Sequence, residues 1–272
     1  MAQTIACANQ KGGVGKTTTV VNLASVLALA GDRVLVIDLD PQGNATSGLG
    51  IDRAAIEQSV YDAVVDGVDL QQLVVPVGAT GIDLVPAAIA LAGAEVELAS
   101  IDARERRLRR LIVSIADRYD VIFIDCPPSL GLLTVNALTA ADAVLIPLQC
   151  EYYALEGLTQ LLATIDLVRD HLNPSVAING VVLTMYDART NLSADVAAEA
   201  RRHLGHLVYD TVVPRSVRLS EAPSHGLAIS GYAPTSRGAE AYRALALEFR
   251  LRLGLAAAPE PTADPVEAMV LT

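Results

Sequence analysis

Short apolar runs alternate along the chain with longer segments in which apolar residues recur every three or four positions. The short runs predict strands buried on both faces, and the longer segments predict helices that cover a sheet. Strands are expected over residues 4–8, 33–37, 82–85, 121–124, 143–148, 181–185 and 207–213. Helices are expected over residues 16–30, 104–118, 155–171, 193–204 and 236–253. Regular alternation of this kind predicts an α/β fold, in which a twisted, mostly parallel sheet carries helices on both faces and right-handed crossovers join the strands.

Length and composition favour a single domain. The chain has 272 residues, and its aromatic content is only 4% with no Trp, so Ala, Val and Leu must fill the core. Residues 1–254 are expected to form this domain. Residues 255–272 are Ala- and Pro-rich, acidic and aperiodic, which predicts a disordered tail. The three cysteines, Cys7, Cys126 and Cys150, lie in apolar runs without a C-x-x-C pattern and are interpreted as buried free thiols in a reducing compartment.

A glycine-rich stretch, K-G-G-V-G-K-T-T-T at residues 11–19, contains the only two lysines of the chain, Lys11 and Lys16. It follows a predicted strand and opens a predicted helix, the setting that a phosphate-binding loop requires. Glycines let backbone N–H groups turn toward an oxyanion, and the helix presents its positive end to it. The residues expected around a polyphosphate are Lys11, Gly12, Gly13, Val14, Gly15, Lys16, Thr17 and Thr18.

Carboxylates follow two of the predicted strands. Asp38 and Asp40 come directly after one strand, and Asp125 follows another. Because ligands of open α/β sheets bind outside the carboxyl ends of the strands, these side chains are expected beside the phosphate loop. The hydroxyl of Thr17 and the carboxylate of Asp125 are the candidate groups for Mg²⁺, the latter through water. Each aspartate, taken alone, is also compatible with a turn residue.

The glycine-rich stretch departs from the ordinary motif G-x-x-x-x-G-K-[ST], because Gln10 occupies the place of the first Gly. The resulting form, K-G-G-x-G-K-[ST], resembles the ParA/MinD group of P-loop ATPases. The resemblance implies ATP and Mg²⁺ as ligands, and it implies that Lys11 reaches the phosphates bound by the partner subunit in a nucleotide-sandwich homodimer. In the segment D-L-D-P-Q-G-N, which is similar to the second signature of that group, Asp40 would activate the attacking water. Both Asp38 and Asp40 would lie near Mg²⁺, bound to it directly or through water.

Four further segments resemble the chromosomal ParA proteins of the Soj type: I-D-C-P-P-S-L-G from Ile124, Q-C-E-Y-Y-A-L-E-G-L from Gln149, T-M-Y-D-A-R-T-N from Thr184 and P-R-S-V-R-L-S-E-A-P-S-H-G from Pro214. The resemblance implies a cytoplasmic, nucleoid-associated protein of chromosome or plasmid partition. A ParB-type centromere-binding protein would stimulate its ATPase activity. Because the phosphate loop begins close to Met1, no helix-turn-helix is expected before it, and site-specific operator binding is not expected.

The same resemblance assigns further site residues. It places the adenine near Met185, Pro214 and Arg215, and it places non-specific contacts to double-stranded DNA at Arg189 and Arg218. The net charge of −11 argues against nucleic acid in general, but arginines concentrate in the C-terminal third, and a dimer doubles any patch they form. The alternative explanation for these arginines is a solvated face or internal ion pairs. The basic run 104–110 is interpreted most simply as the outer face of a helix.

Other interpretations of the loop remain open. A MinD-like membrane-associated positioning ATPase requires a basic amphipathic C-terminal helix, but no Lys or Arg follows Arg252. An iron–sulfur carrier requires a cysteine pair that the chain lacks, and a small-molecule synthetase requires an acceptor motif, of which none is visible. No apolar run is long enough to span a membrane, so no membrane partner is expected. Glu151, Tyr152 and Tyr153 follow a strand, where they would contribute to a dimer or partner surface or to packing.

Overall fold

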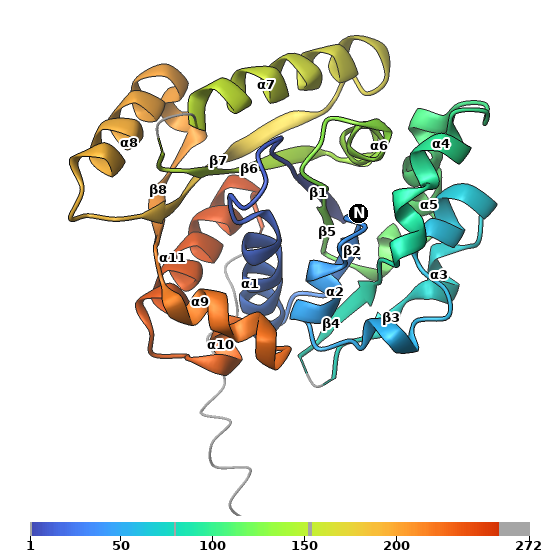
Figure 1. Cartoon of the computed structure of the whole chain (residues 1–272), viewed down its shortest axis with the longest axis horizontal. Coiled ribbons are helices and arrows are strands. Elements are labelled where there is room, and N and C mark those ends of the chain that lie inside the picture. The colour runs from blue at the N-terminus through green and yellow to red at the C-terminus, as the bar shows by residue number, and fades with distance from the viewer. Residues whose placement is uncertain (1, 79, 152–153, 256–272) are drawn as a thin grey trace, which may run out of the picture.

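The computed structural model describes residues 2–78, 80–151 and 154–255. One eight-stranded sheet runs through the molecule in the order β3-β4-β2-β5-β1-β6-β7-β8 (Figure 1). The strands are β1 (Gln3–Cys7), β2 (Val34–Asp38), β3 (Val75–Pro76), β4 (Ile82–Val85), β5 (Val121–Asp125), β6 (Ala143–Gln149), β7 (Ala177–Tyr186) and β8 (Val208–Pro214). Every pairing is parallel except that of β3 with β4. The predicted α/β fold class is confirmed.

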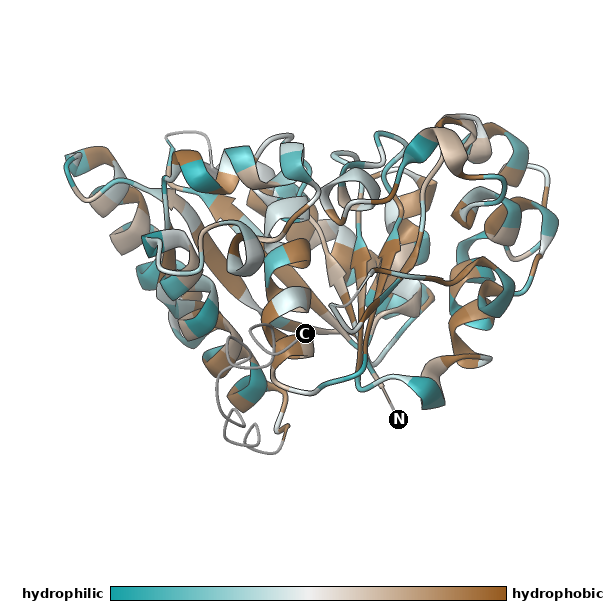
Figure 2. Ribbon diagram, turned by 90° about the horizontal axis from the view of Figure 1, so that it is seen from below, coloured by the Kyte–Doolittle hydropathy of each residue, from teal (hydrophilic) through white to brown (hydrophobic). Residues whose placement is uncertain are grey.

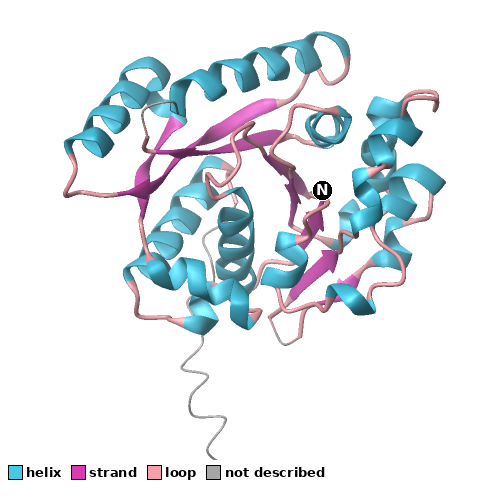
Figure 3. Cartoon of the chain, in the orientation of Figure 1, coloured by secondary structure: helices cyan, strands magenta, loops and turns pink. Residues whose placement is uncertain are grey.

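Helices connect the strands (Figure 3). They are α1 (Lys16–Leu29), α2 (Asn44–Gly48), α3 (Leu70–Leu73), α4 (Ala94–Leu98), α5 (Arg107–Val113), α6 (Leu132–Ala140), α7 (Ala154–His171), α8 (Asn191–Leu204), α9 (Val217–Glu221), α10 (Ile229–Tyr232) and α11 (Arg237–Arg252), with short 3₁₀ and π turns between them. The first helix ends as a left-handed glycine predicts, because Gly31 adopts a φ of 90° just beyond it. Residues 255–272 lie, apart from Leu255, outside the described residues, so the predicted tail stays a prediction.

The predicted helix over residues 104–118 is wrong in its extent. Helix α5 covers only its middle, and 3₁₀ turns occupy residues 104–106 and 116–118. The sequence Val113-Ser114-Ile115 combines residues of modest helix propensity. The Ser114 hydroxyl also donates to the Leu111 carbonyl oxygen at 2.8 Å, an alternative to the helical hydrogen-bond ladder. The helix therefore ends early.

Two apolar layers enclose the sheet, one on each face. Along β5, Ile122 and Ile124 belong to one layer and Val121 and Phe123 to the other, as the alternation of a strand requires. Helices α5, α6, α7 and α8 contribute to the first layer, whereas α1 and α11 contribute to the second. Apolar residues colour the sheet and the inner sides of the helices (Figure 2). The aromatic rings of Phe123 and Phe249 lie 5.6 Å apart between centroids and join α11 to the sheet.

Features at both edges of the sheet disfavour pairing with a further strand. At one edge, β3 is only two residues long and includes Pro76, which has no N–H to donate. At the other edge, the Glu248 carboxylate of α11 accepts hydrogen bonds from the backbone amides of Asp210 and Thr211 in β8, both at 3.0 Å. These amides are therefore unavailable for pairing with another strand.

Register brings the carboxyl ends of the central strands together. Asp125 of β5 pairs with Cys7 of β1 on one side and with Asp38 of β2 on the other. The loop after β1 begins one residue after Cys7, so two aspartates lie directly beside it. All three cysteines are free and buried, as expected.

Candidate functional site

The loop between β1 and α1 has the conformation that anion binding requires. Gly13 and Gly15 adopt φ values of 75° and 91°, in the left-handed region that favours glycine. The first turn of α1 contains no acidic residue, and no side chain caps it, so its N–H groups are available to a phosphate. The Thr184 hydroxyl of β7 donates a hydrogen bond to the Val14 carbonyl oxygen at 2.8 Å and so links the loop to the sheet.

The two lysines of this loop occupy different environments. Lys16 is buried with 6% of its surface exposed, and its Nζ lies 3.4 Å from the carbonyl oxygen of Lys11, so its ammonium crosses the loop. Lys11 projects outward, and its side chain is 37% exposed. The geometry fits Lys16 as the group that contacts the phosphates bound by its own chain.

Asp38 is fully buried and well supplied with donors. It accepts hydrogen bonds from the Thr46 backbone amide at 2.8 Å, from the Thr46 hydroxyl at 2.7 Å and from the Asp40 amide at 3.2 Å. Burial raises the pKa of Asp38 to about 6, although the Thr46 and Asp40 hydrogen bonds counteract this effect. Asp40 is 7% exposed and accepts the Gln42 amide at 2.9 Å, which stabilises the turn before α2.

Asp125 is the least satisfied polar side chain of the site. Both of its carboxylate oxygens are buried, and no described residue makes a well-formed hydrogen bond to them, although the Thr17 hydroxyl lies close by. Burial, and then the charge of Asp38, raise the pKa of Asp125 well above its usual range, while the Thr17 hydroxyl and Lys16 lower it. A buried carboxylate with so few hydrogen bonds is costly in its ionised form, and a cation bound beside it would offset that cost.

These residues fit a magnesium ion. The Thr17 hydroxyl and the Asp125 carboxylate are hard oxygen ligands beside the phosphate loop, with Asp38 next to them. Within the described residues, no three His, Cys, Asp or Glu side chains form a ready-made metal cluster. Mg²⁺ bound here would therefore take much of its coordination from phosphate oxygens and water, as it commonly does.

A pocket of about 510 Å³ continues from the start of α1 toward the C-terminal half of the chain. Six of the predicted nucleotide-binding residues line it: Gly15, Thr17, Thr18, Met185, Pro214 and Arg215. Met185 has a φ of 50°, unusual for a residue with a side chain, which turns the chain at the pocket wall. The structure thus brings the loop together with the three residues predicted for the adenine.

The pocket also contains residues that the sequence did not single out. Asn44 and Ser47 of α2 form one side, and Leu219 and Pro223 form part of another. Asn44 belongs to the D-P-Q-G-N segment that begins at Asp40, and this position was the sequence signal that could have assigned it to the pocket. The other residues come from short helices that have no periodic pattern of their own.

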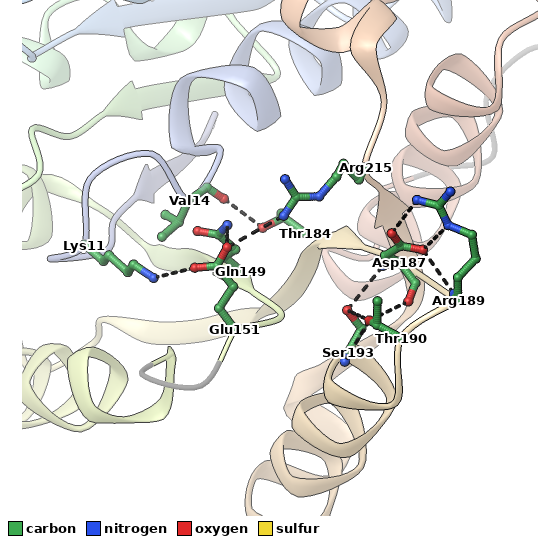
Figure 4. Close-up of polar contacts among 10 residues, drawn as sticks. All are labelled: Lys11, Val14, Gln149, Glu151, Thr184, Asp187, Arg189, Thr190, Ser193 and Arg215. Atoms are coloured by element: carbon green, nitrogen blue, oxygen red, sulfur yellow. Dashed lines mark hydrogen bonds and ion pairs between the residues drawn. The ribbon is translucent and has the colours of Figure 1, made fainter.

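Glu151 lies between Lys11 of the phosphate loop and Arg215 of the pocket (Figure 4). Its Oε2 atom lies 3.1 Å from Lys11 Nζ, and its Oε1 atom lies 3.7 Å from Arg215 Nη2. Sequence reasoning placed Glu151 on a dimer or partner surface without finding these two contacts. Tyr152 and Tyr153, predicted for the same surface, lie outside the described residues.

Both arginines predicted to contact DNA are exposed but paired within the chain. Arg189, whose side chain is 86% exposed, donates to both carboxylate oxygens of Asp187, and its hydrogen bonds hold the pKa of Asp187 well below the usual range. Arg218 donates to Glu221 at 2.9 Å. Such exposed pairs exchange partners readily, because water screens them. The alternative of internal ion pairs is therefore realised in this state, and DNA contact stays a prediction.

The fold and site define a P-loop nucleotide-binding protein with two lysines in its phosphate loop. A family model described as an AAA domain matches residues 2–178. The sporulation initiation inhibitor protein Soj of Bacillus subtilis is 58% identical over 91% of this chain and 98% of its own length. The chromosome partitioning protein ParA of Myxococcus xanthus is 53% identical over 91% of this chain and 88% of its own length. The chain belongs to the Soj/ParA family of P-loop ATPases, as its motifs predicted.

Solved structures agree with this fold. A cobyrinic acid a,c-diamide synthase from Mycobacterium smegmatis, with bound ATP analogue and magnesium, has a TM-score of 0.81 and 39% identity over 93% of this chain and 97% of that chain. The septum site-determining protein MinD from Pyrococcus horikoshii, complexed with Mg-ADP, has a TM-score of 0.76 and 26% identity over 91% of this chain and 96% of that chain. No helix in the described part of the chain is long and apolar enough to cross a membrane.

Proposed function

We propose that the protein is an ATP-dependent switch for the partition of chromosomes or plasmids. ATP and Mg²⁺ would favour a sandwich homodimer that binds double-stranded DNA without sequence preference, and hydrolysis would return the weak-binding state. The single observation that carries this proposal is the site itself: a phosphate loop with a buried Lys16 and an outward-projecting Lys11, in a chain that belongs to the Soj/ParA family.

The proposed roles follow from position and charge. Lys16 and the N–H groups at the start of α1 would hold the β- and γ-phosphates, and Met185, Pro214 and Arg215 would enclose the base. Bound Mg²⁺ would neutralise charge that develops on the phosphates. Asp40 would orient and activate water through its second oxygen, Oδ2, while Oδ1 keeps the Gln42 amide.

Lys11 supports a function that depends on dimerisation. Because its ammonium points out of its own phosphate loop to Glu151, it is available to a second protomer once that pair opens. A cation supplied in trans to a phosphoryl-transfer site accelerates the reaction by about 10³–10⁵. Hydrolysis would then require two chains.

The partners belong to the same proposal. Duplex DNA would replace the carboxylates now paired with Arg189 and Arg218. The basic N-terminal segment of a ParB-type protein would be attracted by the acidic surface, since the chain carries a net charge of −11. Such a protein would act in the cytoplasm, associated with the nucleoid.

Sedimentation with random-sequence DNA tests the function. In ATP with Mg²⁺ the protein should sediment with DNA, and in ADP or without nucleotide it should remain in the supernatant. The Asp40→Ala variant should stay on DNA in ATP, because it assembles but does not hydrolyse. Equal sedimentation in all nucleotide states would refute the switch.

The same assay addresses the two alternatives. Nucleotide-dependent binding to lipid vesicles in place of DNA would support a MinD-like function, which the likeness to the P. horikoshii structure keeps open. ATP hydrolysis stimulated by a small carboxylic acid together with an amine donor, without DNA binding, would support a synthetase, the activity named for the M. smegmatis structure.

A further inference from the structure

One carboxylate, that of Glu151, receives side chains from three separate parts of the chain (Figure 4). Lys11 of the phosphate loop approaches Oε2 at 3.1 Å. Gln149 at the end of β6 donates its Nε2 hydrogen to Oε1 at 2.5 Å, and Arg215 beyond β8 approaches Oε1 at 3.7 Å. Glu151 therefore carries two cations, one on each oxygen.

Arg215 also belongs to the nucleotide pocket. It lines the pocket beside Met185 and Pro214, and its backbone N–H donates to the Tyr186 carbonyl oxygen at 3.0 Å, which fixes the turn after β8. Its guanidinium is too far from Glu151 for a hydrogen bond, but it is close enough for an ion pair. The same residue thus contacts the space for the nucleotide and the counter-ion of Lys11.

The charge balance at Glu151 changes if Lys11 leaves. Removing the only cation from a carboxylate costs more electrostatic energy than removing one of two cations, because the second cation continues to stabilise the negative charge. Arg215 already lies on the other oxygen, so it can approach Glu151 more closely as Lys11 departs. All three side chains are 37–58% exposed, so water screens the interaction and the effect is modest.

We propose that Arg215 is a positioning residue that takes over Glu151 when Lys11 turns toward the partner protomer, and that it thereby couples the nucleotide pocket to dimer formation. This inference rests on the proposed function, in which Lys11 acts in trans. Glu151 is the element through which Arg215 acts, so the two residues must be energetically coupled in dimerisation. A residue that only contacted the nucleotide would show no such coupling.

A double-mutant cycle tests the coupling. The dimer dissociation constant is measured by sedimentation velocity in a non-hydrolysable ATP analogue with Mg²⁺. Arg215→Gln should weaken dimerisation about 2–5-fold, the range of one exposed ion pair, and Glu151→Gln should strengthen it by a similar factor. In the Glu151→Gln background, Arg215→Gln should have no effect. Arg215→Lys, which keeps the charge, should retain the coupling to Glu151 that Arg215→Gln removes.

Two readouts separate the possible outcomes. If Arg215→Gln weakens dimerisation equally in both backgrounds, or lowers the ADP affinity of the monomer by the same factor, Arg215 acts directly on the nucleotide and the inference is overturned. Lys11→Ala serves as the test of the underlying function. If that variant dimerises and hydrolyses ATP like the wild type, Lys11 does not act in trans, and the proposed function fails whatever the cycle shows.

Discussion

At the scale of single residues, the chemistry of the phosphate loop is set by local sequence. Glycine conformations, the first turn of α1 and the buried Lys16 all lie within residues 11–19, so the motif predicted them. The contacts of Lys11 were not predictable in this way. Glu151 and Arg215 are remote in sequence, and only the sheet order and register bring them to the loop. Pairings that depend on tertiary register leave no local signal.

Replacement of Lys16 should abolish tight nucleotide binding. We expect Lys16→Ala to lower the affinity for ADP by about 10–100-fold, because each charge-assisted hydrogen bond that is removed contributes about 1.5–3 kcal/mol. Titration of a fluorescent ADP analogue measures the change. Lys11→Ala is the matched control: its ammonium points away from its own loop, so ADP affinity of the monomer should be nearly unchanged. Equal losses of affinity in the two variants would contradict the assignment.

Asp38 should make the nucleotide-free protein less stable as the pH rises. Its pKa is raised from 3.8 to about 6 in the folded state, so the folded protein binds the proton more tightly than the unfolded chain does. The favourable contribution is complete below pH 4 and is lost as the pH increases through 6. We expect the stability of Asp38→Asn relative to the wild type to increase by about 2 kcal/mol between pH 4 and pH 7.

Urea unfolding of both proteins across this pH range measures the difference. The difference between wild type and variant removes the groups that titrate alike in both proteins, and it reports Asp38 together with its effect on the neighbouring Asp125. A difference that is constant with pH would show that Asp38 ionises normally.

At the scale of elements, long amphipathic helices were predictable and short or wholly buried ones were not. Helices α7, α8 and α11 lie within two residues of their predicted limits. Helix α6 was not predicted from the sequence. Most of its own residues are buried, including the polar Thr134, Asn136 and Thr139, so its apolar residues do not recur with a helical period. Helices of four or five residues, such as α2 and α9, and the two-residue β3 contain too few residues for periodicity to appear.

The turn before α5 contains a residue whose replacement by glycine should stabilise the fold. Ala103 adopts a φ of 51°, which costs a residue with a Cβ atom about 1–2 kcal/mol. We expect Ala103→Gly to raise the free energy of unfolding by about 0.5–1 kcal/mol, since the greater entropy that glycine loses on folding offsets part of the relieved strain. Thermal and urea denaturation measure it.

Ala99 provides the control for this substitution. It is exposed like Ala103 and lies nearby, but its φ of −56° suits any residue. Ala99→Gly should therefore lower stability by about 0.5–1 kcal/mol. If both variants are destabilised, the left-handed conformation at Ala103 does not govern the energetics of this turn.

At the scale of the whole molecule, the family relationship was predictable, because motifs in several separate segments each match it in order. Charge distribution was harder to interpret. The net charge of −11 gives no information about where exposed arginines lie on the surface. The sequence also did not show that Arg189 and Arg218 are paired with carboxylates. Under the proposed function, DNA affinity would therefore depend on exchange between these internal carboxylates and DNA phosphates.

Arg218 should contribute to this exchange. We expect Arg218→Glu to weaken binding to random-sequence DNA and to reduce the slope of log affinity against log salt by about 1 for each phosphate that Arg218 neutralises in the wild type. Fluorescence anisotropy at several salt concentrations measures both quantities. Dimerisation should be unaffected, because Arg218 is proposed to contact DNA and not the partner protomer.

Glu221→Gln is the matched variant for the opposite effect. It removes the carboxylate that now holds Arg218, so DNA affinity should increase. If neither variant changes the affinity or its salt dependence, DNA is bound elsewhere on the surface.

The Glu248 carboxylate on the β8 amides and the proline in β3 have a consequence for assembly. A protein that gathers at high local density along a polymer brings many sheets close together, and an open edge would let them merge irreversibly. Because Pro76 lacks an N–H in one edge strand and Glu248 holds two amides of the other, strand pairing with a neighbouring sheet is disfavoured at these positions. Under the proposed function, molecules crowded on DNA would then separate again after ATP hydrolysis without having joined their sheets.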